Sequence, residues 1–171
     1  FAAYQYPDGK VPCCVDRRGA DPVPEHDSHG ELVHLIAEVY RYTRDRAFAE
    51  ELFPHVERAV DAIEVLRQQR RTADYAKGPK QVFFGLLPES ISHEGYSSKP
   101  VHSYWDDTFA YRGLDDAVAL ARALDRDELA AEWARRRDEF RTDLLASIAR
   151  VRKQHRLADL PASAGLADFD S

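Results

Sequence analysis

The fold is indicated first by residues 31–71, "ELVHLIAEVYRYTRDRAFAEELFPHVERAVDAIEVLRQQRR". Residues 32–40 are apolar over most of a helix circumference, which is typical of a helix buried on several sides. After the short break "TRD" at 43–45, apolar residues recur at steps of three and four, which predicts a long amphipathic helix over 46–71. Because a short turn joins the two helices, we expect them to form an antiparallel hairpin.

The same order recurs in the second half of the chain. Residues 104–124, "YWDDTFAYRGLDDAVALARAL", are mostly apolar and small, and residues 126–153 form a second charged helix with one apolar face. We therefore predict an all-α chain in which buried helices alternate with half-exposed ones in two layers. In such an arrangement the three long loops, 1–27, 72–103 and 154–171, lie on one rim.

Three local features carry further expectations. "SHGE" matches a capping box, with Ser28 as the N-cap and Glu31 at the third helical position. Residues 81–87, "QVFFGLL", are compatible with a short β segment. The adjacent cysteines at 13 and 14 are too close for an unstrained mutual disulfide, and we expect them to be small buried residues.

Composition limits the classes of function. The 171 residues are 44% hydrophobic and 32% charged, with a net charge of −6, which suits one globular unit. The acidic balance argues against nucleic acid or an anionic membrane surface as a partner, and no apolar run approaches the ~20 residues of a membrane span. There is no methionine, so we expect a piece of a longer polypeptide, whose remainder is a partner of this segment.

The stretch "HSYWDD" at 102–107 is the main candidate for a site. Asp is favoured at the start of a helix, so capping alone is one explanation. The other is a sugar site, in which an aromatic ring stacks on the sugar and a carboxyl protonates the glycosidic oxygen. Glycoside hydrolysis uses two carboxyl groups, and the acid must stay protonated near neutral pH. Asp106, beside Trp105 and Asp107, meets that requirement.

Further candidates lie in the loops of the same rim. Glu89 and Glu94 in "PESISHEG" are candidates for binding sugar hydroxyls, as is Asp27 in "PEHDSH". Tyr104 and Trp105 are candidates for a stacking platform, although packing is the alternative for each ring. The histidines of "PEHDSH" lack the spacing of a metal-binding helix, so we expect no metal and no organic cofactor.

Four segments resemble the six-hairpin glycosidases, the (α/α)6-toroid enzymes that include glucoamylases and trehalases. They are "PEHDSHGELVHLIAEVYRYTRD" (24–45), "GLLPESISHEGY" (85–96), "HSYWDDTFAYRGLDDAVALA" (102–121) and "LPASAGLADFD" (160–170). They look like bacterial glycosidase-like proteins of this superfamily. The resemblance implies that residues 1–171 form about two of the six hairpins of a toroid, with mouth loops.

The resemblance also assigns roles. In glucoamylases an inner helix opens with Trp and two Glu, the first being the general acid. By that resemblance Asp106 is the general acid and Asp107 is a substrate-binding or supporting residue, although Asp replaces Glu here. The second carboxylate lies on a later inner helix, and the reaction is inverting. The alternatives are a non-catalytic helical module that binds carbohydrate or acts as a scaffold, and a polysaccharide lyase.

Overall fold

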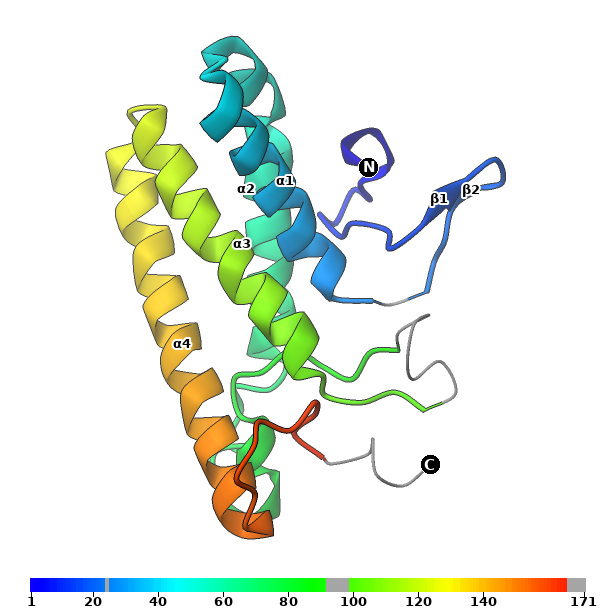
Figure 1. The fold of residues 1–171 in the computed structure, drawn as a ribbon, viewed down its shortest axis with the longest axis vertical. Coiled ribbons are helices and arrows are strands. Elements are labelled where there is room, and N and C mark those ends of the chain that lie inside the picture. Colours follow the sequence, from blue (N-terminus) through cyan, green and yellow to red (C-terminus); the bar gives the residue numbers. More distant parts are fainter. Residues whose placement is uncertain (24, 92–98, 166–171) are drawn as a thin grey trace.

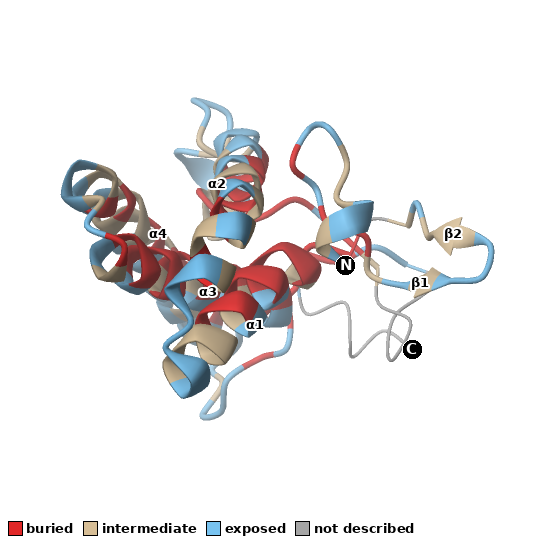
Figure 2. Ribbon diagram, turned by 90° about the horizontal axis from the view of Figure 1, so that it is seen from above, coloured by how far each residue is buried: buried red, intermediate tan, exposed pale blue. Residues whose placement is uncertain are grey.

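The computed structural model describes residues 1–23, 25–91 and 99–165 (Figure 1). Four long helices dominate it, which confirms the all-α class: α1 (Asp27–Thr43), α2 (Arg46–Gln68), α3 (Tyr104–Ala123) and α4 (Asp127–His155). The smaller elements are two 3-10 helices, η1 (Ala2–Tyr4) and η2 (Gly78–Phe83), and an antiparallel pair of short strands, β1 (Val15–Asp16) and β2 (Gly19–Ala20). The pair β1–β2 projects away from the helices (Figures 1 and 2).

The helices form two hairpins side by side. In Figure 1, α1 and α3 both begin toward the lower end of the view and run upward, while α2 and α4 return. The turns at 44–45 and 124–126 are short, whereas long segments lead into the starts of α1 and α3. Two hairpins are not a ring, so the toroid stays a prediction.

The core lies where the four helices meet, as the buried residues in Figure 2 show. It is built from the apolar faces predicted by periodicity, including Phe53 of α2 stacked on Trp133 of α4 at 5.6 Å between ring centroids. Helix α1 is covered on fewer sides than its composition predicts, since Leu35 is 55% exposed. None of the helices in the described residues is both long enough and apolar enough to cross a lipid bilayer.

Glycines bring α1 and α3 into backbone contact. A Cβ atom added at Gly30 would lie 2.0 Å from the carbonyl oxygen of Phe109, and one added at Gly113 would lie 2.6 Å from the Cα of Gly30. Neither distance is possible for a side chain, so only glycine permits this approach. The contact holds the first turn of α1 against the second and third turns of α3.

Three local expectations are wrong. Helix α1 begins at Asp27 with His26 at the N-cap, and no side chain caps it; the Ser28 hydroxyl donates to Asp27 instead of capping. Residues 81–83 end the 3-10 helix η2, which the proline near its start favours over a strand. The cysteines at 13 and 14 are partly buried and exposed, because their segment runs over the surface.

Candidate functional site

Asp106 lies in the first turn of α3, but it is not the capping residue. Ser103 is the N-cap, and its hydroxyl accepts a hydrogen bond from the backbone N–H of Asp106 at 3.5 Å. The Asp106 carboxyl is therefore available for other partners. It accepts hydrogen bonds from the Ser90 hydroxyl and from the backbone N–H of His26, and the residue is only 2% exposed.

The surroundings of Asp106 hold its proton near neutral pH. Burial raises the pKa of the carboxyl to about 7, and the nearby charge of Asp27 adds to the rise. The hydrogen bonds from Ser90, His26 and Ser103 lower the pKa in part. An acid with this pKa is protonated in about half of the molecules at pH 7, which is the condition that suits a proton donor or acceptor in catalysis.

Asp107 is a different kind of acid. It is fully buried, and one of its oxygens accepts the backbone N–H of Leu87 at 2.9 Å. Burial raises its pKa well above the usual range, against a small opposing effect of the Arg67 charge. The second oxygen, Oδ2, has no hydrogen-bond partner among the described residues. Asp107 thus ties the long loop to α3, which fits the supporting half of its predicted role.

The side chain that holds this loop from behind is Arg67 of α2. It is fully buried, and its Nε donates to the carbonyl oxygen of Gly85 at 3.2 Å, two residues before Leu87. Its other nitrogens pair with Glu64 at 3.0 Å and with Asp143 of α4 at 3.1 Å. This ion pair network fixes the backbone that reaches Asp107.

Trp105 and Asp27 join the two hairpins. The indole Nε1 of Trp105 donates to the Asp27 carboxylate at 2.9 Å, across the α1–α3 contact. The indole is 60% exposed and leans on Phe109, with 4.8 Å between ring centroids. Partial burial raises the pKa of Asp27, and the Trp105 N–H lowers it only in part. A fixed, exposed aromatic ring beside carboxyl groups is suited to stacking on a sugar.

Tyr104 points the other way. It is buried between α3 and α4, where its hydroxyl bonds with the Ser147 hydroxyl at 2.8 Å, and burial raises its pKa to about 12. This position makes Tyr104 a packing residue, so we do not retain it among the substrate-binding candidates.

Glu89 lines a pocket of about 360 Å³, together with the ring of Phe83 and the imidazole of His102. His102 stacks on Phe83 with 4.2 Å between centroids, and burial lowers its pKa to about 4. Arg70 donates to His102 at 3.2 Å and forms an ion pair with Glu89.

The pKa of Glu89 is lowered. Partial burial acts to raise it, but three effects together outweigh that: the backbone N–H of Glu89 itself, the His102 ring when it is protonated, and the hydrogen bond and charge of Arg70. Glu89 is therefore ionised at neutral pH, which suits a group that accepts hydrogen bonds from ligand hydroxyls better than a proton donor.

Long-range loop contacts bring these residues together. Ser90 pairs with Val101, and Ser103 pairs with Ser163, each as an isolated antiparallel bridge. The two loops that follow α2 and α4 therefore meet at the start of α3. Glu94 and the "DFD" acids at 168–170 lie outside the described residues. Ser90, Ser103 and Arg70 were missed, because Ser and Arg in loops carry no distinctive pattern.

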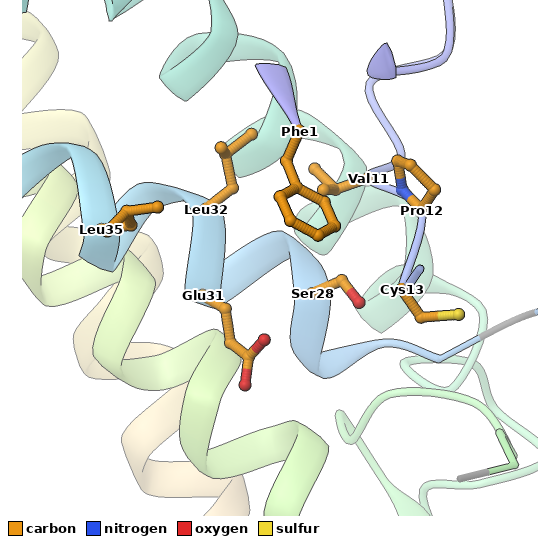
Figure 3. A pocket seen from close by; sticks show the side chains of 8 residues that line it. All are labelled: Phe1, Val11, Pro12, Cys13, Ser28, Glu31, Leu32 and Leu35. Atoms are coloured by element: carbon orange, nitrogen blue, oxygen red, sulfur yellow. The ribbon is translucent and has the colours of Figure 1, made fainter. Parts of the chain in front are cut away.

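A separate pocket of about 190 Å³ lies along the flank of α1 (Figure 3). Its lining is mainly apolar, with Phe1, Leu32 and Leu35 on its walls and Ser28 and Glu31 as its polar members. None of the predicted site residues that the structure describes lines this pocket. Within the part of the chain that the structure describes, no three His, Cys, Asp or Glu side chains are grouped to hold a metal ion.

The comparisons with known proteins give no relative. No family model matches the chain, and no curated protein and no solved structure is significantly similar to it.

Proposed function

We propose that this chain is part of the catalytic domain of a glycoside hydrolase, with Asp106 as the general acid. The observation that supports this is the Asp106 carboxyl, whose pKa is raised to about 7 by burial, next to an exposed tryptophan. A carboxyl kept protonated by an apolar setting is the usual source of the proton in glycosidases.

Each neighbour has a part in the proposed reaction. The Trp105 indole, held by Asp27, stacks on a sugar face, and Glu89 accepts hydrogen bonds from sugar hydroxyls. Asp106 donates its proton to the glycosidic oxygen while a water molecule attacks carbon, which requires a second carboxylate as base. That base lies outside the two hairpins in this proposal, and the reaction inverts the anomeric configuration.

The test is the activity of the full-length parent protein on a panel of aryl glycosides and oligosaccharides. Asp106→Asn keeps the shape of the side chain but removes the proton, so we expect kcat to fall by about 100-fold or more. The matched control is Asp127→Asn. Asp127 is also an aspartate in the first turn of a helix, but it is exposed and lies at the opposite end of the bundle.

One result would overturn this assignment of the acid. An Asp106→Asn variant that folds and keeps wild-type turnover removes Asp106 as the acid and leaves Glu89 and Glu94 as candidates. Circular dichroism and the melting temperature establish that the variant folds.

A non-catalytic carbohydrate-binding module is the second candidate. The observation that favours it is that Asp106 is only 2% exposed, whereas Trp105 is 60% exposed. Binding of an oligosaccharide that depends on Trp105, with no hydrolysis of any panel member by the parent protein, would support this function instead.

A further inference from the structure

A third pocket, of about 220 Å³, lies behind the start of α1. It is enclosed by the N-terminal segment, the first turn of α1 and the end of α2. Its polar lining consists of Tyr6, Lys10, Glu25, His26, His29 and Gln69. None of the acids assigned to catalysis above lines it, so it is distinct from the Trp105 surface and from the Glu89 pocket.

His29 is the unusual residue of this pocket. The side chain is 2% exposed, and neither ring nitrogen has a hydrogen-bond partner among the described residues. Buried polar atoms are nearly always paired, and a group left unpaired in the protein alone indicates a ligand or bound water. The nearest ring is that of His26, at 6.0 Å between centroids in an edge-on arrangement, which satisfies neither nitrogen.

The charge state of the two histidines narrows the class of ligand. Burial lowers the pKa of His29 to about 3 and that of His26 to about 4, so both rings are neutral at pH 7. A neutral imidazole has one N–H donor and one acceptor nitrogen. A hydroxyl group likewise donates and accepts, so an array of hydroxyls is the natural complement of these rings.

Anions and apolar ligands fit less well. The Lys10 ammonium is paired with Asp8 at 3.1 Å, and the Glu25 side chain is itself part of the lining, so the pocket has no excess of positive charge. An apolar ligand would leave the His29 nitrogens unpaired. The volume corresponds to roughly seven water molecules at ~30 Å³ each, which is space for a small polyol or one sugar ring.

We propose that this pocket binds a neutral polyol, a sugar alcohol or a single sugar ring, through the His29 imidazole. The pocket touches the proposed acid through His26, whose ring lines it while its backbone N–H bonds with the Asp106 carboxyl. The site deepens the proposed function, and only its role as a sugar subsite rests on that function. The binding itself rests on the His29 geometry.

The experiment follows the imidazole nitrogens of the full chain by ¹⁵N NMR during titration with D-glucose and with D-sorbitol. We expect the His29 nitrogen resonances to shift and to saturate in the millimolar range. His29→Phe should weaken binding at least tenfold while keeping or raising the melting temperature, because it removes two unpaired polar atoms. Gln69→Leu, at the pocket wall, is the second variant should His29→Phe not fold.

Controls separate this site from the proposed catalysis. His155→Phe replaces an exposed histidine at the end of α4 and should leave binding unchanged. Asp106→Asn should abolish hydrolysis but keep the His29 response. If the His29 resonances shift on titration with polyol and the parent protein hydrolyses no glycoside, the hydrolase proposal fails and the proposed polyol site remains.

Two outcomes would overturn the proposal that this pocket binds a polyol. One is a His29 response to inorganic phosphate with none to either polyol, which makes it an anion site. The other is no His29 response to any probe up to 100 mM, which leaves only bound water as the partner of the ring.

Discussion

The raised pKa of Asp106 makes a thermodynamic prediction that needs no substrate. The ordinary value is 3.8 and the folded value is about 7. The folded state therefore binds this proton more tightly than the unfolded chain. The resulting stabilisation is complete below the unfolded pKa and is lost as pH rises through the folded pKa.

The magnitude follows from the two values. One pKa unit corresponds to about 1.4 kcal/mol. Between pH 4.5 and pH 7.5 the carboxyl should therefore lose about 3 kcal/mol of its contribution to the free energy of unfolding. Asp106→Asn cannot titrate, so the difference between wild type and variant should change by that amount in favour of the variant as pH rises.

The difference between proteins is needed because other groups titrate in the same window. Asp107 and Asp27 have raised pKa values and act in the same direction as Asp106. His26, His29 and His102 have lowered pKa values, so their contributions are lost as pH falls, with the opposite sign. Subtracting the variant cancels the histidine contributions and leaves that of Asp106 together with its electrostatic coupling to Asp27 and Asp107.

The assay is urea unfolding of wild type and Asp106→Asn at half-unit steps from pH 4.5 to pH 7.5. Asp127→Asn serves as the exposed control, and its difference from wild type should not vary over this range. A wild-type minus Asp106→Asn difference that stays constant within about 0.5 kcal/mol would refute the reasoning, because a carboxyl with an ordinary pKa contributes no slope there.

Three further predictions concern packing and binding. Gly113→Ala places a Cβ against the backbone of α1, so it should lower the free energy of unfolding by about 1–3 kcal/mol, measured with urea against Ala119→Gly as a control for helix propensity. Arg67→Met removes one of the two arginine partners of Asp143 and leaves Arg71 as the other. We therefore expect the free energy of unfolding to fall by about 2 kcal/mol, which is below the range for breaking a fully buried ion pair. An unchanged melting temperature would contradict the role of Arg67. Trp105→Ala removes a mostly exposed ring, so it should change stability by under ~1 kcal/mol while weakening oligosaccharide binding by calorimetry, and unchanged affinity would rule out stacking.

The helices were predictable because their signal is local. The apolar steps around Val56 and Val60, and the short breaks before Arg46 and Asp127, fix helix type and connection without any knowledge of partners. The end at which the long loops lie then follows from the order of long and short connections. Leu35 shows the limit of prediction from apolar periodicity. An apolar residue shows that a helix face is suited to burial, but it does not show which element covers that face.

The site was less predictable because it depends on contacts between distant residues. The acids at the start of α3 can be identified from the sequence, but the different structural role of each one cannot. Ser103 takes the capping role, Ser90 reaches Asp106 from a loop, and the Leu87 backbone reaches Asp107. Tyr104 and Trp105 are neighbours in the chain, yet the helical turn sends one ring to the core and the other to the surface.

The contact between Gly30 and Gly113 also indicates which parts of the chain can change in sequence without altering the helix packing. Because it joins backbone to backbone, the contact sets the closest approach of the two hairpins at this point. The bond from Trp105 to Asp27 spans the same pair of helices, and the Trp105 ring also packs on Phe109. Changes in the loop between α2 and α3 that keep residues 85–90 would thus alter the ligand side of the site without moving its aromatic anchor. The buried bonds from that segment to Arg67, Asp106 and Asp107 would be preserved.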